Sequence, residues 1–270
     1  MRSTAIRFAD LWAVDPHQMV DEIYSPDSEM ENMASPARLV LGAEQLHDVE
    51  DRLSVMIPEH RHELVRVIVA GDVACLETTI VAPLSHEYAP ACVWWWLDGD
   101  GKVSAETGWF DWADRSQEPA RSHGTVPETR RMTVEPAAYR AIADEYAHGW
   151  TNDPAGSALQ MFASGCTFGR VGVDEASGID ALRTSRGEIA AAVPRRSMVV
   201  DSVVGEDSCL ALLVTVGTST DVTRGTVVLT LGDGDLVISE RTYLDWNRAV
   251  PRHSIGPRPW VGTARWTSTH

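Results

Sequence analysis

The sequence is short of several features that would define a function at once. It holds a single lysine, Lys102, and no apolar run near the ~20 residues that cross a bilayer. Its four cysteines form no C-x-x-C pair, and His60 and His62 have no third ligand at a recognisable spacing. The N-terminus lacks the apolar core of a signal peptide. We therefore expect a soluble cytoplasmic protein without membrane contact, metal or cofactor.

Positive charge is scarce in the first part of the chain. Residues 1–114 carry 21 acidic and 7 basic side chains, a net charge of −14, whereas the remaining residues carry 18 and 16, a net charge of −2. A surface this acidic repels phosphate groups. The composition thus argues against nucleic acid and against polyanionic ligands such as nucleotides.

What the sequence does contain is the same pattern twice. The offset between paired positions is 138, then 136, then 134, so two small deletions account for every change. The pairs keep their order along the chain: Trp12, Asp15, Pro16 and Tyr24 with Trp150, Asp153, Pro154 and Phe162; Gly42 and Pro58 with Gly178 and Pro194; Gly71, Cys75 and Leu76 with Gly205, Cys209 and Leu210; Glu106, Asp111 and Trp112 with Glu240, Asp245 and Trp246. We interpret this as a duplicated domain, with repeats at 1–114 and 133–248, a linker at 115–132 and a basic tail at 249–270.

Each repeat is predicted to run from a helix through a short strand and a second helix into several long strands. The first helix of the second repeat is predicted to start near Thr133. The second helices follow Gly42 and Gly178, and both end at a proline. Apolar and β-branched runs joined by Gly-Asp turns predict the strands of the first repeat at 62–70, 73–82, 91–97 and 103–112.

Three stretches in each repeat accompany this order of elements. In the first repeat they are I-Y-S-P-D-S-E-M-E-N, W-L-D-G-D-G-K-V and G-W-F-D-W, and in the second M-F-A-S-G-C-T-F-G-R, L-G-D-G-D-L-V and R-T-Y-L-D-W. They resemble the nuclear transport factor 2-like superfamily, in its SnoaL-like and ketosteroid-isomerase-like branch. The resemblance implies an α+β fold, a curved antiparallel sheet wrapped around helices to form a cone with an apolar pocket. It also implies pairing through the outer sheet surface, hence an internal pseudo-dimer in a monomer, or a homodimer.

Members of that family include isomerases, dehydratases, epoxide hydrolases and polyketide cyclases, and also non-catalytic binding and assembly domains. The general base of the ketosteroid isomerases would fall at Asn32 and Arg170, neither of which is a carboxylate. Their oxyanion-side acid would fall near Val93 and Val227, although Tyr146 matches their helix tyrosine. Steroid-isomerase chemistry is therefore not expected.

Polyether epoxide-opening cyclases offer a second comparison, because some resemble this chain in having tandem domains. Their aspartate and glutamate would correspond to Asn32 with Glu59 in the first repeat, and to Arg170 with Arg195 in the second. Glu59 alone keeps the required chemistry. The second repeat is thus expected to be an inactive scaffold, unless its arginines hold an anionic substrate.

The first repeat concentrates ionisable groups that the second lacks. Glu77 lies in an apolar predicted strand where the alignment gives the second repeat an alanine, Ala211, and His86 and Tyr88 precede the Trp94–Trp96 run. A carboxylate in an apolar pocket can have its pKa raised toward neutrality, and a histidine can shuttle protons. One hypothesis is that Glu77 and His86 act as base and acid, with Glu59 as a further candidate. The alternative is that these groups face solvent.

Binding roles are expected for a second set of side chains. Strand alternation sets Trp95 opposite Trp94 and Trp96, so one face supplies core or pocket and the other an interface. The expected substrate-binding residues are Asn32, Tyr88, Trp95, Tyr146 and Arg170.

Two functions are compatible with these residues. The first is proton-transfer chemistry on a small lipophilic metabolite, by isomerisation, dehydration, cyclisation or epoxide opening. The second is a small-molecule-binding or assembly module without turnover. Convergence of two or more ionisable groups inside one cone favours the first, whereas cones filled with apolar side chains favour the second.

Overall fold

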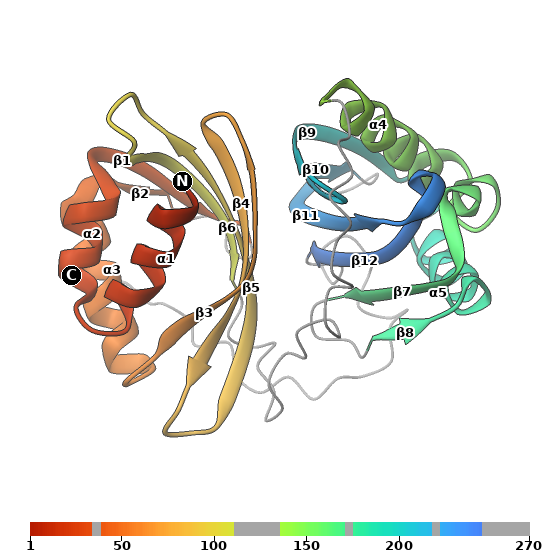
Figure 1. Cartoon of the computed structure of the whole chain (residues 1–270). Helices are drawn as coiled ribbons and strands as arrows, with labels where there is room; N and C mark the ends of the chain where they lie inside the picture. Colours follow the sequence, from red (N-terminus) through yellow and green to blue (C-terminus); the bar gives the residue numbers. More distant parts are fainter. Residues whose placement is uncertain (34–38, 111–135, 171–174, 218–221, 245–270) are drawn as a thin grey trace.

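The computed structural model describes residues 1–33, 39–110, 136–170, 175–217 and 222–244. Within them lie two domains that repeat one order of elements (Figure 1). The first domain comprises α1 (Arg2–Trp12), α2 (Pro16–Ile23), β1 (Tyr24–Asn32), β2 (Leu39–Leu41), α3 (Gly42–Met56), β3 (Arg61–Ala70), β4 (Val73–Ala82), β5 (Glu87–Leu97) and β6 (Val103–Phe110). The second comprises α4 (Pro136–Asn152), the 3-10 turn η2 (Ser157–Met161), β7 (Phe162–Arg170), β8 (Ala176–Ser177), α5 (Ile179–Ala192), β9 (Ser197–Glu206), β10 (Cys209–Gly217), β11 (Val222–Leu231), η3 (Asp233–Asp235) and β12 (Val237–Leu244).

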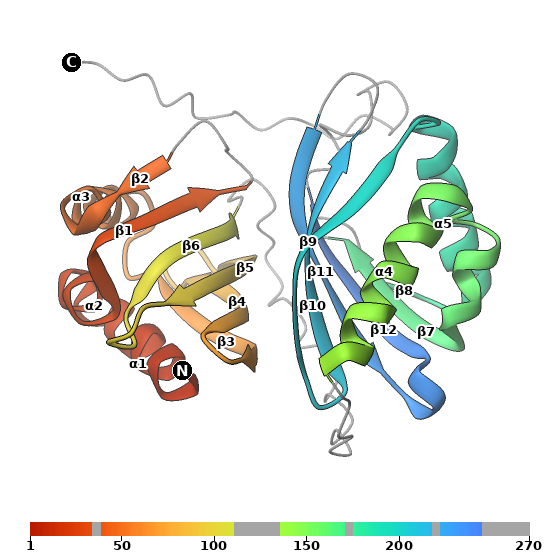
Figure 2. The ribbon, with the colours of Figure 1, turned by 90° about the horizontal axis from the view of Figure 1, so that it is seen from above.

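Each domain forms one curved six-stranded sheet. The strand orders are β2-β1-β6-β5-β4-β3 and β8-β7-β12-β11-β10-β9, the same order twice. Neighbouring strands are antiparallel except for β1–β6 and β7–β12, which are parallel. Helices cover one face of each sheet, and the two uncovered faces pack against each other (Figures 1 and 2). The expected α+β architecture, two cones joined as an internal pseudo-dimer, is confirmed.

Local sequence signals fix the helix starts. Asp15 caps α2 by accepting a hydrogen bond from the Gln18 backbone N–H, and Pro16 supplies the first helical residue. Its counterpart Asp153 accepts from the Ser157 backbone N–H at 2.7 Å in the second domain. The predicted second helices match α3 and α5. Thr133, the predicted start of α4, lies outside the described residues, as do the whole linker and the basic tail.

The registers of the last two strands confirm the offset of 134. Glu106 on β6 lies opposite Trp95 on β5, and Glu240 on β12 lies opposite Leu229 on β11. The repeated glutamates therefore hold the same place in both sheets.

The register of β4 corrects the sequence alignment. Leu76 lies opposite Val93, whereas Leu212 lies opposite Val227, so β4 and β10 are related by 136 rather than 134. A shift of two residues leaves every side chain on the same face, so the hydrophobic pattern alone could not detect it. The predicted equivalence of the two strand cysteines is thus wrong. The corrected pairs are Cys75 with Ala211, Glu77 with Leu213 and His62 with Met198.

Three apolar clusters make up the packed interior. One fills the first domain between its helices and sheet, one fills the second domain, and the third lies between the two sheets. Trp95 belongs to the first cluster, whereas Trp94 and Trp96 belong to the third, which confirms the predicted alternation. None of the described helices has the length and apolar character to cross a membrane.

The contact between the sheets also includes polar bonds. Trp94 Nε1 donates to Thr226 Oγ1 at 2.9 Å, and Arg66 Nη1 donates to Thr230 Oγ1 at 3.0 Å. The rings of Trp109 and Tyr243 lie 6.1 Å apart. Because these last two residues are themselves related by 134, they meet close to the pseudo-two-fold axis.

Candidate acid–base site in the first domain

Glu77 is not in the interior of the first domain. It projects from the opposite face of β4, toward the second domain, and is 1 % exposed. Its Oε2 lies 3.2 Å from Arg66 Nε, and Tyr243 donates its hydroxyl to Glu77 Oε1 at 2.9 Å. Glu77 therefore pairs with an arginine of its own sheet and accepts a hydrogen bond from the other sheet, a structural arrangement.

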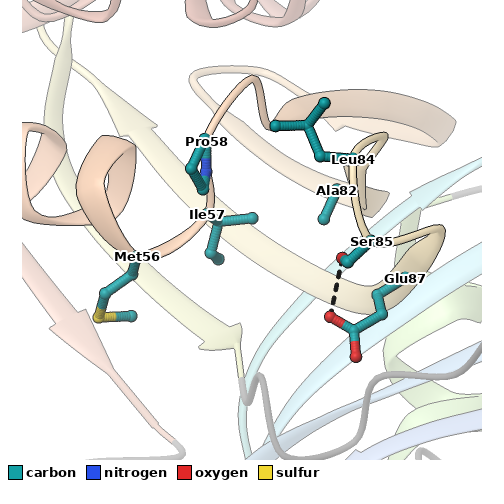
Figure 3. Close-up of a pocket in the computed structure, with 7 residues that line it drawn as sticks. All are labelled: Met56, Ile57, Pro58, Ala82, Leu84, Ser85 and Glu87. Carbon is teal, nitrogen blue, oxygen red and sulfur yellow. Dashed lines mark hydrogen bonds between the residues drawn. The ribbon is translucent and has the colours of Figure 1, made fainter.

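His86 and Glu59 lie in exposed turns at one end of the first domain. Both have a positive φ, 54° and 58°. They flank a pocket of about 270 Å³ formed by the end of α3 and the β4–β5 turn, and Ser85 and Glu87 are hydrogen-bonded at its rim (Figure 3). The pocket lining consists of Met56, Ile57, Pro58, Ala82, Leu84, Ser85 and Glu87. The predicted Glu77–His86 pair is thus corrected, because its members lie on different surfaces.

The predicted binding residues are dispersed. Asn32 ends β1 and donates its side-chain amide to the Phe110 carbonyl at 3.1 Å. Tyr88 is half-buried on β5, opposite Val81. Arg170 ends β7, opposite Thr242, and its backbone alone is described. Trp95 and Tyr146 do lie in the interiors of their domains.

The interior of the first domain, between α1–α3 and the inner face of the sheet, is called cone one below. It contains a buried glutamate, Glu50, and a partly buried one, Glu106. Trp12 Nε1 donates to Glu50, which projects from α3. Glu106 on β6 accepts from the Tyr24 hydroxyl and from Trp95 Nε1, the latter at 2.9 Å. Five elements, α1, α3, β1, β5 and β6, therefore direct donors and acids to one place.

Burial alters the protonation of these groups. Burial raises the pKa of Glu50 to about 8, opposed by the Trp12 hydrogen bond and reinforced by the charge of Glu106. Burial also raises the pKa of Glu106, while bonds from Tyr24 and Trp95 oppose the rise. Glu50 is therefore mostly a neutral acid at pH 7 and a carboxylate only above about pH 8.

Two histidines complete the polar lining of cone one. His60 Nδ1 lies 2.7 Å from the Ile57 carbonyl, and His62 Nδ1 lies 3.1 Å from Thr78 Oγ1. Both rings are buried against Trp12, and burial lowers both pKa values, so both are neutral at pH 7. Because a carbonyl only accepts, His60 Nδ1 carries the proton. Its Nε2 is then a bare acceptor, buried and without a hydrogen-bond partner among the described residues. His62 Nε2 is likewise buried without such a partner, but the Thr78 hydroxyl can donate or accept, so the contact at Nδ1 does not fix the tautomer of His62.

In the interior of the second domain, called cone two below, the buried glutamate is paired with a buried arginine. Arg186 on α5 lies 2.5 Å from Glu240 Oε2, with both side chains buried. Its guanidinium carbon lies 5.3, 5.1 and 4.6 Å from the ring centres of Tyr146, Trp150 and Phe162. Cone two thus contains an internally neutralised pair.

Glu50 and Arg186 hold the same position in the two domains. The helices α3 and α5 are related by 136, since Leu46 and Leu182 are both buried, and Glu50 plus 136 is Arg186. The repeated sequence already contains this signal, a glutamate in one repeat against an arginine in the other. The family resemblance pointed away from it, because it implies carboxylates at other positions. No three described His, Cys, Asp or Glu side chains are grouped so as to hold a metal ion.

No protein-family model matches the sequence, and no curated protein matches it significantly. Several solved structures are similar to about two fifths of the chain. One, from Catenulispora acidiphila, has a ketosteroid isomerase-like fold and was solved with trimethylamine (14% identity, 41% of this chain, 86% of that chain, TM-score 0.37). Another is an epoxide hydrolase/cyclase-like enzyme of pyran ring formation in the polyether salinomycin (18% identity, 42% of this chain, 94% of that chain, TM-score 0.37). A third is a SnoaL-like protein from Burkholderia thailandensis (16% identity, 41% of this chain, 93% of that chain, TM-score 0.36).

The architecture itself identifies the fold. Each domain places helices first and wraps a curved six-stranded sheet around them, with the same strand order in both. The chain thus carries the nuclear transport factor 2-like fold twice, in tandem.

Proposed function

We propose that cone one catalyses proton transfer on a small lipophilic molecule without a cofactor, and that the second domain is a scaffold. The observation that carries this proposal is the contrast between equivalent positions. Cone two pairs Arg186 with Glu240, whereas cone one brings Glu50 into the range of Glu106 with no buried cation among the described residues. A buried acid beside a partly buried one costs free energy that a purely structural core would avoid.

The groups of cone one suit an acid–base mechanism. Glu50 is neutral near pH 7 and can donate a proton, because its pKa is about 8. His60 Nε2 and Glu106 are acceptors, and Tyr24 and Trp95 fix the orientation of Glu106. Isomerisation, dehydration, cyclisation and epoxide opening each need one group that gives a proton and one that takes it. The aromatic walls of cone one would bind the apolar part of the substrate.

The pocket beside Ile57 is the proposed entrance. Ile57 lines it, and the Ile57 carbonyl bonds to His60, whose ring packs on Trp12 next to Glu50. Movement of the β4–β5 turn, which holds His86, would open this route. Glu59 and His86 therefore stay in the proposal as groups at the entrance rather than at the reacting atoms.

A binding module without turnover is the second candidate. The observation in its favour is that Trp12, His62 and Trp95 pack directly on one another or on Phe8 inside cone one. A ligand must displace side chains to enter, and such a site can bind without catalysing.

The test is turnover of a panel of small epoxides, β-hydroxy ketones and β,γ-unsaturated ketones by the full chain. We expect Glu50→Gln and Glu106→Gln to lower kcat by about 10²-fold or more. Glu63→Gln, an exposed change on the same strand as His62, should leave it unchanged. Ligand binding without turnover would favour the binding module. Turnover that survives both interior changes would refute the proposed site.

A further inference from the structure

Cone two contains a cation that belongs to the chain itself. The Arg186 guanidinium lies over three aromatic rings at 4.6–5.3 Å and pairs with Glu240. A cation over aromatic faces, with a carboxylate beside it, is the arrangement that proteins use to hold organic ammonium groups. Cone two is thus a cation site that is occupied by an arginine side chain of the same chain.

Cone one has aromatic side chains at the same three positions and no arginine among them. The ring positions Tyr146, Trp150 and Phe162 of cone two correspond to Phe8, Trp12 and Tyr24, all three buried. The carboxylate position Glu240 corresponds to Glu106. The arginine position is Glu50, which adds a second acid where cone two has a base.

The hydrogen-bonding capacity of cone one points the same way. One unpartnered buried nitrogen, His60 Nε2, is an acceptor in the neutral ring, since Nδ1 donates to the Ile57 carbonyl. The other, His62 Nε2, is an acceptor when Nδ1 donates to the Thr78 hydroxyl, which can also donate. Glu50 and Glu106 add further acceptor oxygens. A ligand that supplies N–H donors and positive charge would satisfy this interior, whereas an anion would meet two carboxyl groups.

No described side chain supplies that charge. Arg186 is the only buried arginine or lysine in the part of the chain that the structure describes. Residues 1–114 have a net charge of −14, which favours the approach of a cation.

We propose that cone one binds a protonated organic amine with an apolar skeleton, whose ammonium group takes the place that the Arg186 guanidinium takes in cone two. Binding of the amine does not depend on catalysis, but the inference that an amine is the substrate rests on the proposed function. Entry of the cation would ionise Glu50 and release its proton to solvent, because the pKa of Glu50 is about 8 in the free protein.

The test is calorimetric binding to the full chain of n-alkylammonium ions from methyl to hexyl, each against the n-alkan-1-ol of the same length. We expect each ammonium ion that binds to do so at least tenfold more tightly than its alcohol. At pH 7, titrations in buffers of different ionisation enthalpy should show proton release. Alcohols that bind as tightly as the ammonium ions, or an absence of binding across the ammonium series, would overturn the proposal.

Variants assign the binding to cone one. Glu106→Gln should weaken ammonium binding at least tenfold, and Glu50→Gln should weaken it and abolish the proton release. Glu50→Arg reproduces cone two and should exclude the ligand; where that variant does not fold, the two glutamine variants decide. Glu63→Gln is the control for general loss of negative charge. Ammonium affinity unchanged in the Glu106 and Glu50 variants would overturn the assignment.

The outcomes separate this inference from the proposed function. Turnover of neutral substrates with no ammonium affinity would refute the amine and leave the acid–base mechanism. Ammonium affinity with no turnover of any amine or neutral compound would leave a cation-binding module.

Discussion

Tyr243 of the second domain donates its hydroxyl hydrogen bond to Glu77 of the first, at 2.9 Å, in the buried contact between the sheets. Arg66 lies on the other side of the same carboxylate, at 3.2 Å, with 11 % of its side chain exposed. Three residues from three strands of two domains therefore share one buried negative charge.

Removal of that charge should be costly. Glu77→Leu leaves the Arg66 guanidinium between the sheets without its counter-charge, so we expect the free energy of unfolding to fall by roughly 3–5 kcal/mol. Arg66→Met combined with Glu77→Leu should recover most of the loss. Urea unfolding of Glu77→Leu, of Arg66→Met and of the double variant measures the coupling, and equal losses in Glu77→Leu and the double variant would contradict it.

Arg186 should show the same asymmetry inside cone two. Arg186→Met leaves Glu240 buried without a counter-charge and should cost about 3–5 kcal/mol. Adding Glu240→Gln should restore stability. Arg183→Met, on the exposed side of the same helix, is the control and should cost little. A destabilisation of similar size in both single variants would show that the pair is not the cause.

Glu50 makes stability depend on pH in a defined direction. Its folded pKa of about 8 exceeds the unfolded value of about 4.3, so the folded state binds the extra proton between those limits. Its contribution is present in full below about pH 4 and is lost as pH rises toward about 8, at up to ~1.4 kcal/mol per pH unit. Glu50→Gln should remove this term. The free energy of unfolding of the variant minus that of the wild type, measured by urea unfolding from pH 5 to 8.5, should increase with pH, because only the wild type loses this contribution.

Two glycines test backbone constraint with a matched pair. Both have positive φ, 76° at Gly42 and 61° at Gly71. An added Cβ at Gly42 would lie 2.9 Å from the Pro26 carbonyl, whereas at Gly71 it would meet nothing within 4 Å. Gly71→Ala should cost about 1–2 kcal/mol for the left-handed conformation alone. Gly42→Ala should cost more, and the excess, read from thermal or urea unfolding, measures the contact with the carbonyl.

The fold could be predicted from the sequence because its signals are local and repeated. Asp15-Pro16 and Asp153-Pro154 mark chain turns before a helix or 3-10 turn, and the Gly-Asp turns bound strands of alternating pattern. The slip of two residues over β4 came from coincident glycines and cysteines. Strand periodicity cannot reveal such a slip, and only the cross-strand partners of Leu76 could.

The candidate site could be predicted only in kind. The sequence predicts an acid–base cluster in the first repeat, but it favours Glu77 over Glu50 because an apolar strand suggests a pocket. Both faces of β4 are buried, one in cone one and one against the second sheet, so an apolar strand does not distinguish pocket from interface. The distinction depends on how the two domains pack, which no local pattern encodes.

The covalent pairing of the two domains also frees their shared interface from symmetry. In a homodimer with two-fold symmetry, every substitution appears on both sides of the contact, and a buried Glu77 would always face its partner's copy of the same patch. Here the residue at the place of Glu77 in the second sheet is Leu213, and Trp109 meets Tyr243 rather than another tryptophan. Each domain can therefore mutate alone, so that one domain is free to diverge in its chemistry while the other keeps the residues of the shared interface.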